Sequence, residues 1–230
     1  MAARFDWLLL DADDTVLDFT GTAPAALERA CRAVLGGWQG AWLELFLEVN
    51  HAMWRELESG RLTADELRDR RFGVFAERLG REVDGRAFDD RYLDELAAVA
   101  RPLDGARGVV ERLAGRVGLA VATNGLAAAQ RRRLATAGLA DHLDRVLISE
   151  ELGAAKPDPA FFEAALERLG RPPRERVLMV GDGLQTDIRG ALAAGLPACW
   201  YNPAGLAPAA DLAPTYEIRR LAELVGLVLG

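Results

Sequence analysis

The segment FDWLLLDADDT, from Phe5 to Thr15, decides the fold of this chain. Its first part, Phe5 to Leu10, is a near-continuous apolar run, which is typical of a strand buried on both faces. Comparable runs recur at residues 117–122, 145–148, 177–180 and 197–201. Because the gaps between these runs can hold helices, the pattern predicts alternating strands and helices around a parallel sheet.

Glycine and proline predict where the covering helices begin and end. Helices expected over residues 104–115 and 126–138 both close at a glycine, which favours a left-handed helix cap. Prolines at 157 and 159 open a helix that runs to residue 169, and another is expected over residues 186–194. The Pro- and Ala-rich residues 203–214 predict a surface loop, and a last helix is expected over residues 219–229.

Residues 16–100 interrupt this alternation and predict an inserted helical domain. They contain no convincing strand, and their amphipathic stretches predict helices over residues 22–35, 42–57, 63–79 and 86–99. Thr63 and Glu66 form a capping box at the start of the third. The fold class is therefore α/β, with a core made of residues 1–15 and 101–230.

Composition narrows the possible functions of the 230 residues. A net charge of -7 argues against a nucleic-acid polymer or an anionic membrane surface as the main partner. Cys31 and Cys199 lack a CxxC spacing and are expected to be buried thiols, while His51 and His142 are too few for a zinc site or a Ser-His-Asp triad. No leader pattern or long apolar run is visible, so a cytoplasmic protein is expected. Carboxylates must carry any chemistry.

Asp11, Asp13 and Thr15 follow the first predicted strand, at the sheet edge where ligands bind in parallel sheets. One carboxylate there could attack a phosphorus atom, while a second could protonate the leaving oxygen and later activate water. Acidic turns also follow strands for purely local reasons, so the segment alone leaves both interpretations open.

Two further segments offer groups that suit an anion. Thr123, Asn124 and Gly125 follow a predicted strand and precede a helix, where a hydroxyl and backbone N–H groups can hold a phosphoryl group. A simple helix cap explains this tripeptide equally well. Lys156 precedes a helix-opening proline and could neutralise acyl-phosphate oxygens, although a single lysine is more often solvated.

The segment Gly181 to Asp187, GDGLQTD, adds Asp182 and Asp187 at the end of another predicted strand. Carboxylates crowded at one edge raise one another's pKa, which indicates a cation, and oxygen ligands of this type suit Mg²⁺. Three strand ends that present Asp, Thr and Asp beside a lysine exceed what random turns supply. The sequence therefore predicts a magnesium-dependent phosphate site.

These segments resemble the four motifs of the haloacid-dehalogenase-like superfamily, in its phosphatase branch with a helical cap. DADDT is similar to the first motif, Thr123 in ATNG to the second, Lys156 in AAKPDP to the third and GDGLQTD to the fourth. The resemblance implies a Rossmann-like three-layer core, and a cap over residues 16–100 that closes as a lid and excludes water.

The resemblance also implies a role for each motif residue. Asp11 would be the nucleophile and a Mg²⁺ ligand, and Asp13 the general acid/base whose backbone carbonyl binds Mg²⁺. The other implied roles are phosphoryl binding for Thr123 and Lys156, direct Mg²⁺ ligation for Asp182, and orientation of a metal-bound water or of Lys156 for Asp187.

Three stretches, DADDTVLDF, VNHAMWRELESGRLTADELRDRRF and VLISEELGAAKP, resemble bacterial pyrimidine 5'-nucleotidases of this superfamily. The implied substrate is a small phosphorylated metabolite, a nucleoside 5'-monophosphate. Asn50 and Trp54 share a helix face, so Trp54 could stack on a base while Asn50 reads a polar edge. Packing inside the cap is the alternative for Trp54, and Arg71 and Phe72 are candidates for a lid role.

Other functions remain open from the sequence. A sugar-phosphate phosphatase, another small-metabolite phosphatase or a phosphomutase would differ mainly in the cap. Asp13 favours phosphate esters, because a dehalogenase needs no acid there. A non-enzymatic alternative is a receiver-like phosphoacceptor switch, although receivers hold the phosphorylated Asp on a middle strand and lack a helical insertion.

Overall fold

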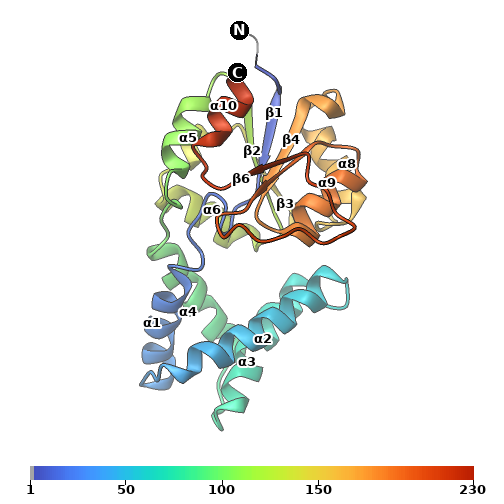
Figure 1. The fold of residues 1–230 in the computed structure, drawn as a ribbon. Helices are drawn as coiled ribbons and strands as arrows, with labels where there is room; N and C mark the ends of the chain where they lie inside the picture. The colour runs from blue at the N-terminus through green and yellow to red at the C-terminus, as the bar shows by residue number, and fades with distance from the viewer. Residues whose placement is uncertain (1–2) are drawn as a thin grey trace. The chain divides into compact units, whose positions relative to one another are not determined.

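The apolar runs form one six-stranded parallel sheet in the computed structural model, which describes residues 3–230 (Figure 1). Its strands are β1 (Trp7–Leu10), β2 (Gly118–Thr123), β3 (Arg145–Ile148), β4 (Val177–Gly181), β5 (Ala198–Tyr201) and β6 (Tyr216–Ile218). The order β3-β2-β1-β4-β5-β6 means that the sheet grows outward from β1 in both directions. This doubly wound order puts the topological switch point beside β1, where such sheets bind ligands. The predicted Rossmann-like α/β fold is confirmed.

Helices cover both faces of the sheet, so the core has three layers. The core helices are α5 (Ala106–Leu113), α6 (Ala127–Thr136), α7 (Ser149–Leu152), α8 (Pro159–Arg168), α9 (Arg189–Ala193) and α10 (Glu223–Leu229). Leu8 and Leu10 belong to the apolar cluster with α5, α6 and α10, whereas Leu9 belongs to the cluster with α8 and α9. Figure 1 shows α5 and α10 on one side of the sheet and α8 and α9 on the other. Because side chains alternate along a strand, burial of both faces explains the continuous apolar runs.

Short turns of helix complete the core. Residues Ala140–His142 (η1) and Arg174–Arg176 (η2) form 3₁₀ turns before β3 and β4. The helix expected over residues 186–194 is in fact a π-helical turn, η3 (Leu184–Ile188), followed by α9. The π turn is marked by the Ile188 amide, which donates to the carbonyl of Gly183 five residues earlier, and the Asp187 amide donates to the same carbonyl.

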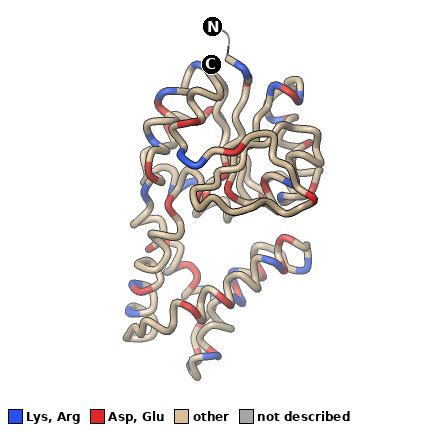
Figure 2. Tube along the Cα trace, viewed as in Figure 1, with Lys and Arg blue, Asp and Glu red and all other residues tan. Residues whose placement is uncertain are grey.

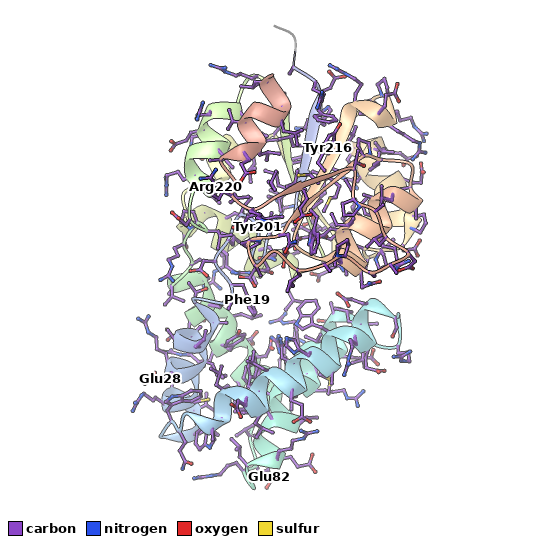
Figure 3. All side chains as sticks on the ribbon, in the orientation of Figure 1. Phe19, Glu28, Glu82, Tyr201, Tyr216 and Arg220 are labelled. Carbon is purple, nitrogen blue, oxygen red and sulfur yellow. The ribbon has the colours of Figure 1, made fainter. Side chains whose placement is uncertain are left out.

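The sixth strand was not expected. β6 has only three residues and pairs with β5 through Cys199↔Tyr216 and Tyr201↔Ile218. Tyr216, labelled in Figure 3, packs edge-on against Phe5 with ring centroids 6.2 Å apart. Residues 219–222 form a bend and a turn after β6, so the last helix begins at Glu223 rather than at residue 219.

Residues Phe19–Ala100 form a second compact unit of four helices. They are α1 (Ala23–Leu35), α2 (Ala41–Glu58), α3 (Ala64–Arg78) and α4 (Gly85–Ala98), close to the predicted ranges. The capping box is present, because Thr63 Oγ1 accepts from the Glu66 amide and Glu66 accepts from the Thr63 amide. The unit begins after Asp18 rather than after residue 15, since the Asp18 amide donates to the Arg101 carbonyl (3.1 Å) and ties this stretch to the core.

The helical unit has its own apolar interior. Phe72 stacks on Phe88 and on Phe46, with centroids 4.4 and 5.2 Å apart, and Phe75 and Tyr92 complete the aromatic cluster. Aromatic pairs of this kind stabilise a fold beyond the area they bury. The helical unit, predicted to be a cap, therefore folds around an apolar core distinct from those on the two faces of the sheet.

Acidic and basic residues are interspersed along both units (Figure 2). Cys31 and Cys199 are free and buried, as expected. Within residues 3–230, none of the helices combines the length and the apolar character needed to cross a membrane.

Candidate active site

Three carboxylates meet where β1 and β4 end. Asp11 follows β1, Asp182 follows β4 and Asp187 lies in η3, and one oxygen of each lies within 4.8 Å of the others. Asp11 is fixed at this edge because its amide donates to the carbonyl of Val180 on the neighbouring strand, at 2.9 Å. The structure thus brings Asp11 beside two carboxylates from the far end of the sequence, at the switch point of the sheet.

Lys156 is the only lysine in the sequence, and it is buried among these carboxylates. Its Nζ lies 2.6 Å from Asp11 Oδ1, 2.6 Å from Asp187 Oδ1 and 2.7 Å from the Ala122 carbonyl oxygen. Burial lowers the pKa of Lys156, but the charges of Asp11 and Asp187 outweigh burial and raise the pKa above its ordinary value. The ammonium group is therefore charged, and its three N–H donors are all in use.

This bonding defines what Lys156 and Asn124 contact within the protein. The Lys156 donors serve Asp11, Asp187 and a carbonyl, so Lys156 offsets the charge of the carboxylates, while phosphoryl binding by Lys156 stays a prediction. Asn124 was expected to bind substrate. In the structure its side chain forms two hydrogen bonds with the Lys156 backbone. Asn124 Oδ1 accepts from the Lys156 N–H, and Asn124 Nδ2 donates to the Lys156 carbonyl, both at 2.8 Å. The Lys156–Pro157 peptide bond is cis.

The carboxylates are crowded enough to change their acidity. Burial, and then the charge of Asp187, raise the pKa of Asp11 well above its usual range, although Lys156 acts in the opposite sense. Burial and the neighbouring Asp187 and Asp14 raise the pKa of Asp182 to about 6. One lysine does not offset this charge, and a donor set made only of oxygens fits Mg²⁺.

Two neighbouring residues form hydrogen bonds with Asp182 and fix its position. Thr15 is fully buried, and its hydroxyl donates to Asp182 Oδ1 and accepts from the Asp182 amide, both at 3.2 Å. Thr15 was expected to contact substrate, and this burial makes it a support for Asp182 instead. Trp200 Nε1 on β5 donates to the Asp182 carbonyl at 3.0 Å, a contact that the sequence did not suggest.

Asp187 is also committed to protein partners. Its Oδ1 accepts from Lys156 and its Oδ2 from the Gly183 amide at 3.0 Å, and the residue is 1% exposed. This bonding favours the orientation of Lys156 over direct ligation of a metal. Gly181 must lack a side chain here, because a Cβ would lie 2.1 Å from Asp187 Oδ2.

Asp13 bonds to two side chains of α6, and one of them, Gln130, also reaches Thr123. Gln130 Nε2 donates to Asp13 Oδ2 at 2.9 Å and to Thr123 Oγ1 at 3.0 Å, and Arg133 Nη1 lies 2.5 Å from Asp13 Oδ1. The amide of Gly125, which was expected to hold an anion, donates to Thr123 Oγ1 at 3.0 Å. Sequence reasoning missed Gln130 and Arg133, since an arginine-rich helix usually indicates a solvated face. Their spacing of three residues was the available signal.

The residues predicted to contact substrate or to act in a lid differ in burial and bonding within the helical unit. Asn50 is 4% exposed, and its Oδ1 accepts from Arg71 Nη1 at 2.9 Å, so this oxygen is bonded within the helical unit, and base recognition by Asn50 stays a prediction. Arg71 also pairs with the buried Asp89, and Phe72 lies in the aromatic cluster, which makes both part of the cap interior. Trp54 is half-buried and is not among the described residues that form the cap's apolar core.

Comparisons with known proteins agree with this geometry. Residues 5–195 match the family model for a hydrolase, the haloacid dehalogenase-like hydrolase. The chain is 35% identical over 228 residues to pyrimidine 5'-nucleotidase YjjG of Escherichia coli (strain K12), covering 98% of each protein. It is 34% identical to pyrimidine 5'-nucleotidase PynA of Streptococcus pneumoniae (strain ATCC BAA-255 / R6), covering 96% of this chain and 94% of that protein.

A solved structure shares the fold over nearly the whole chain. The putative HAD-hydrolase YfnB from Bacillus subtilis, whose crystal structure is bound to magnesium and reveals interdomain movement, matches with a TM-score of 0.88 at 32% identity. The match covers 97% of this chain and 98% of that one. On the sequence match, the near-complete coverage and the fold, the chain belongs to the haloacid dehalogenase-like hydrolase family.

Proposed function

We propose that this hydrolase is a Mg²⁺-dependent phosphomonoesterase that forms an aspartyl-phosphate on Asp11, with nucleoside 5'-monophosphates as its substrates. The observation that carries the proposal is the Lys156 ammonium group, held 2.6 Å from both Asp11 and Asp187 at the switch point of the sheet. A buried cation in this position opposes the rise in the pKa of Asp11 that burial and Asp187 cause, and it fixes the orientation of the carboxylate that would attack phosphorus.

The proposed reaction consists of two displacements at phosphorus, and Asp11 and Asp13 act in both. In the first, an Asp11 oxygen bonds to phosphorus and the ester P–O bond breaks, while the Asp13 carboxyl gives its proton to the departing alkoxide oxygen. In the second, the Asp13 carboxylate takes a proton from water, whose oxygen bonds to phosphorus as the bond to Asp11 breaks. Inorganic phosphate leaves, and both carboxyl groups return to their starting states.

Asp11, Asp182 and the backbone carbonyl of Asp13 are the groups that would hold Mg²⁺. Bound there, Mg²⁺ would offset the charge of the phosphoryl oxygens and of the carboxylates. The all-oxygen donor set and the raised pKa values of Asp11 and Asp182 support this assignment. The magnesium-bound structure of the relative YfnB supports it independently.

The substrate class rests on the relatives and on the cap. YjjG and PynA carry the name pyrimidine 5'-nucleotidase, and their alignments span nearly the whole chain. Trp54 offers an aromatic surface outside the described cap core, which suits stacking on a base. A sugar-phosphate phosphatase or a phosphomutase of the same family is the alternative. A receiver-like switch is no longer an alternative, because the chain belongs to a hydrolase family.

The proposal is tested by measuring phosphate release from a panel of nucleoside 5'-monophosphates and sugar phosphates, with and without EDTA. We expect wild-type protein to prefer the nucleotides and to lose turnover in EDTA. Asp11→Asn should abolish turnover while the thermal unfolding transition is retained. Preference for the sugar phosphates removes the nucleotidase assignment, and retained activity in Asp11→Asn removes the covalent mechanism.

A further inference from the structure

Two polar side chains of α6 are buried beside the site although the proposed chemistry does not use them. Gln130 is 2% exposed and Arg133 is 3% exposed. Burial of an amide and of a guanidinium group is unfavourable unless their polar atoms are bonded. The two side chains bond to each other, since Arg133 Nη1 lies 2.8 Å from Gln130 Oε1. Asp13 and Thr123, both at the active site, are also among their partners.

Each oxygen of the Asp13 carboxylate has its own donor from this pair. Arg133 Nη1 lies 2.5 Å from Oδ1, and Gln130 Nε2 lies 2.9 Å from Oδ2. The Asp13 side chain is 36% exposed, so without these donors it would be free to rotate. With one donor on each oxygen, both the position and the plane of the carboxylate are fixed.

The backbone around Gln130 is shaped to admit it. A Cβ on Gly125 would lie 2.3 Å from Gln130 Nε2, so glycine at this position makes room for the amide. The same amide nitrogen reaches Thr123 Oγ1 at 3.0 Å. Gln130 thus joins the hydroxyl at the end of β2 to the carboxylate that follows β1.

We propose that Arg133, acting with Gln130, is a positioning residue for proton transfer by Asp13. This inference rests on the proposed function, in which Asp13 protonates the leaving oxygen. Arg133 is buried and acts through Asp13, which it holds at the angle and distance that the transfer to the ester oxygen requires. Misplacement of a reacting group by about 1 Å can cost roughly 10²-fold in rate.

Leaving-group dependence separates this role from a purely structural one. Departure of p-nitrophenolate needs little protonation, whereas departure of an alkoxide from a nucleotide or from glycerol phosphate needs a proton. The comparison uses kcat/KM, which reports the first displacement, since water attack in the second displacement also involves Asp13. Arg133→Met removes the donors and keeps an apolar stem of similar length.

For Arg133→Met we expect kcat/KM to fall by about 10²-fold on the alkyl phosphate and by less than about 5-fold on p-nitrophenyl phosphate. Gln130→Met leaves the guanidinium group in place, so kcat/KM should again fall more on the alkyl phosphate than on p-nitrophenyl phosphate, but by a smaller factor. This variant keeps the test available if Arg133→Met unfolds. The matched control is Arg131→Met on the same helix, where the arginine is exposed and pairs with Glu151.

Equal losses on both substrates, or no loss on either, would overturn the positioning role while leaving the proposed function in place. Absence of phosphatase turnover in the wild-type protein would overturn the proposed function, and with it this inference. Thermal melting of each variant separates a rate effect from unfolding.

Discussion

Lys156 is a single buried cation that faces two carboxylates, so its removal is expected to lower the free energy of unfolding. In Lys156→Met, the carboxylates of Asp11 and Asp187 lose the charge 2.6 Å away that offsets their own. Breaking a buried pair in this way destabilises a protein by about 3–5 kcal/mol. Urea denaturation without divalent cations should show a loss of this size.

Arg131→Met is the control for Lys156→Met, because the ion pair between Arg131 and Glu151 is exposed and should change stability by less than about 1 kcal/mol. If the two variants unfold at the same urea concentration, the charge of Lys156 does not stabilise the carboxylates as described.

Individual site residues could be predicted where short segments place them at strand ends. Asp11, Thr123, Lys156 and Asp182 each follow an apolar run or precede a helix-opening proline, and all of them lie at one edge of the sheet. Arg133 could not be assigned in this way, since its partner Asp13 is 120 positions away in the sequence. Nothing local distinguishes a buried arginine that bonds a distant carboxylate from its solvated neighbours.

At the scale of elements, the turn from β4 into η3 depends on a close approach that only glycine permits. In Gly181→Ala, the new Cβ would lie 2.1 Å from Asp187 Oδ2 while the backbone is held by β4. Overpacking of this kind costs about 1–3 kcal/mol. We expect the free energy of unfolding, measured in urea, to fall by this amount.

The control is Gly226→Ala in α10, which makes the same chemical change at a position where the free energy of unfolding should rise. A Cβ at Gly226 meets nothing within 4 Å, and alanine is the better helix former, so stability should rise by about 0.5–1 kcal/mol. A fall in stability for both variants would mean that loss of glycine itself, rather than the contact with Asp187, is responsible.

Elements were predictable in proportion to their length and regularity. The first five strands are apolar runs, and the four cap helices are long and amphipathic, so local sequence suffices for them. β6 has three residues at the sheet edge and is defined by its pairing with β5, which no local pattern encodes. The π turn of η3 is likewise marked by the Ile188 amide, which donates to the Gly183 carbonyl five residues earlier.

At the scale of the whole molecule, the crowded carboxylates couple folding to pH and to metal. Asp182 has a pKa of about 6 in the folded, metal-free protein, against an ordinary value of 3.8. Between these values the folded state binds more protons than the unfolded state, so the free energy of unfolding falls as pH rises from about 4 to 6. Asp11, whose pKa is raised in the same direction, adds to this effect.

Mg²⁺ should reverse this loss, because it binds the ionised carboxylates of the folded state. The increase in Tm on adding Mg²⁺ is therefore expected to be small at pH 5, where a proton must leave Asp182, and larger at pH 7.5. Differential scanning fluorimetry at both pH values measures the increase, and Asp182→Asn, which removes a ligand and the titrating group together, should show little gain at either. An equal gain for wild-type protein at pH 5 and 7.5 would mean that the ion binds away from these carboxylates, since only a site built from them must compete with protons in this range.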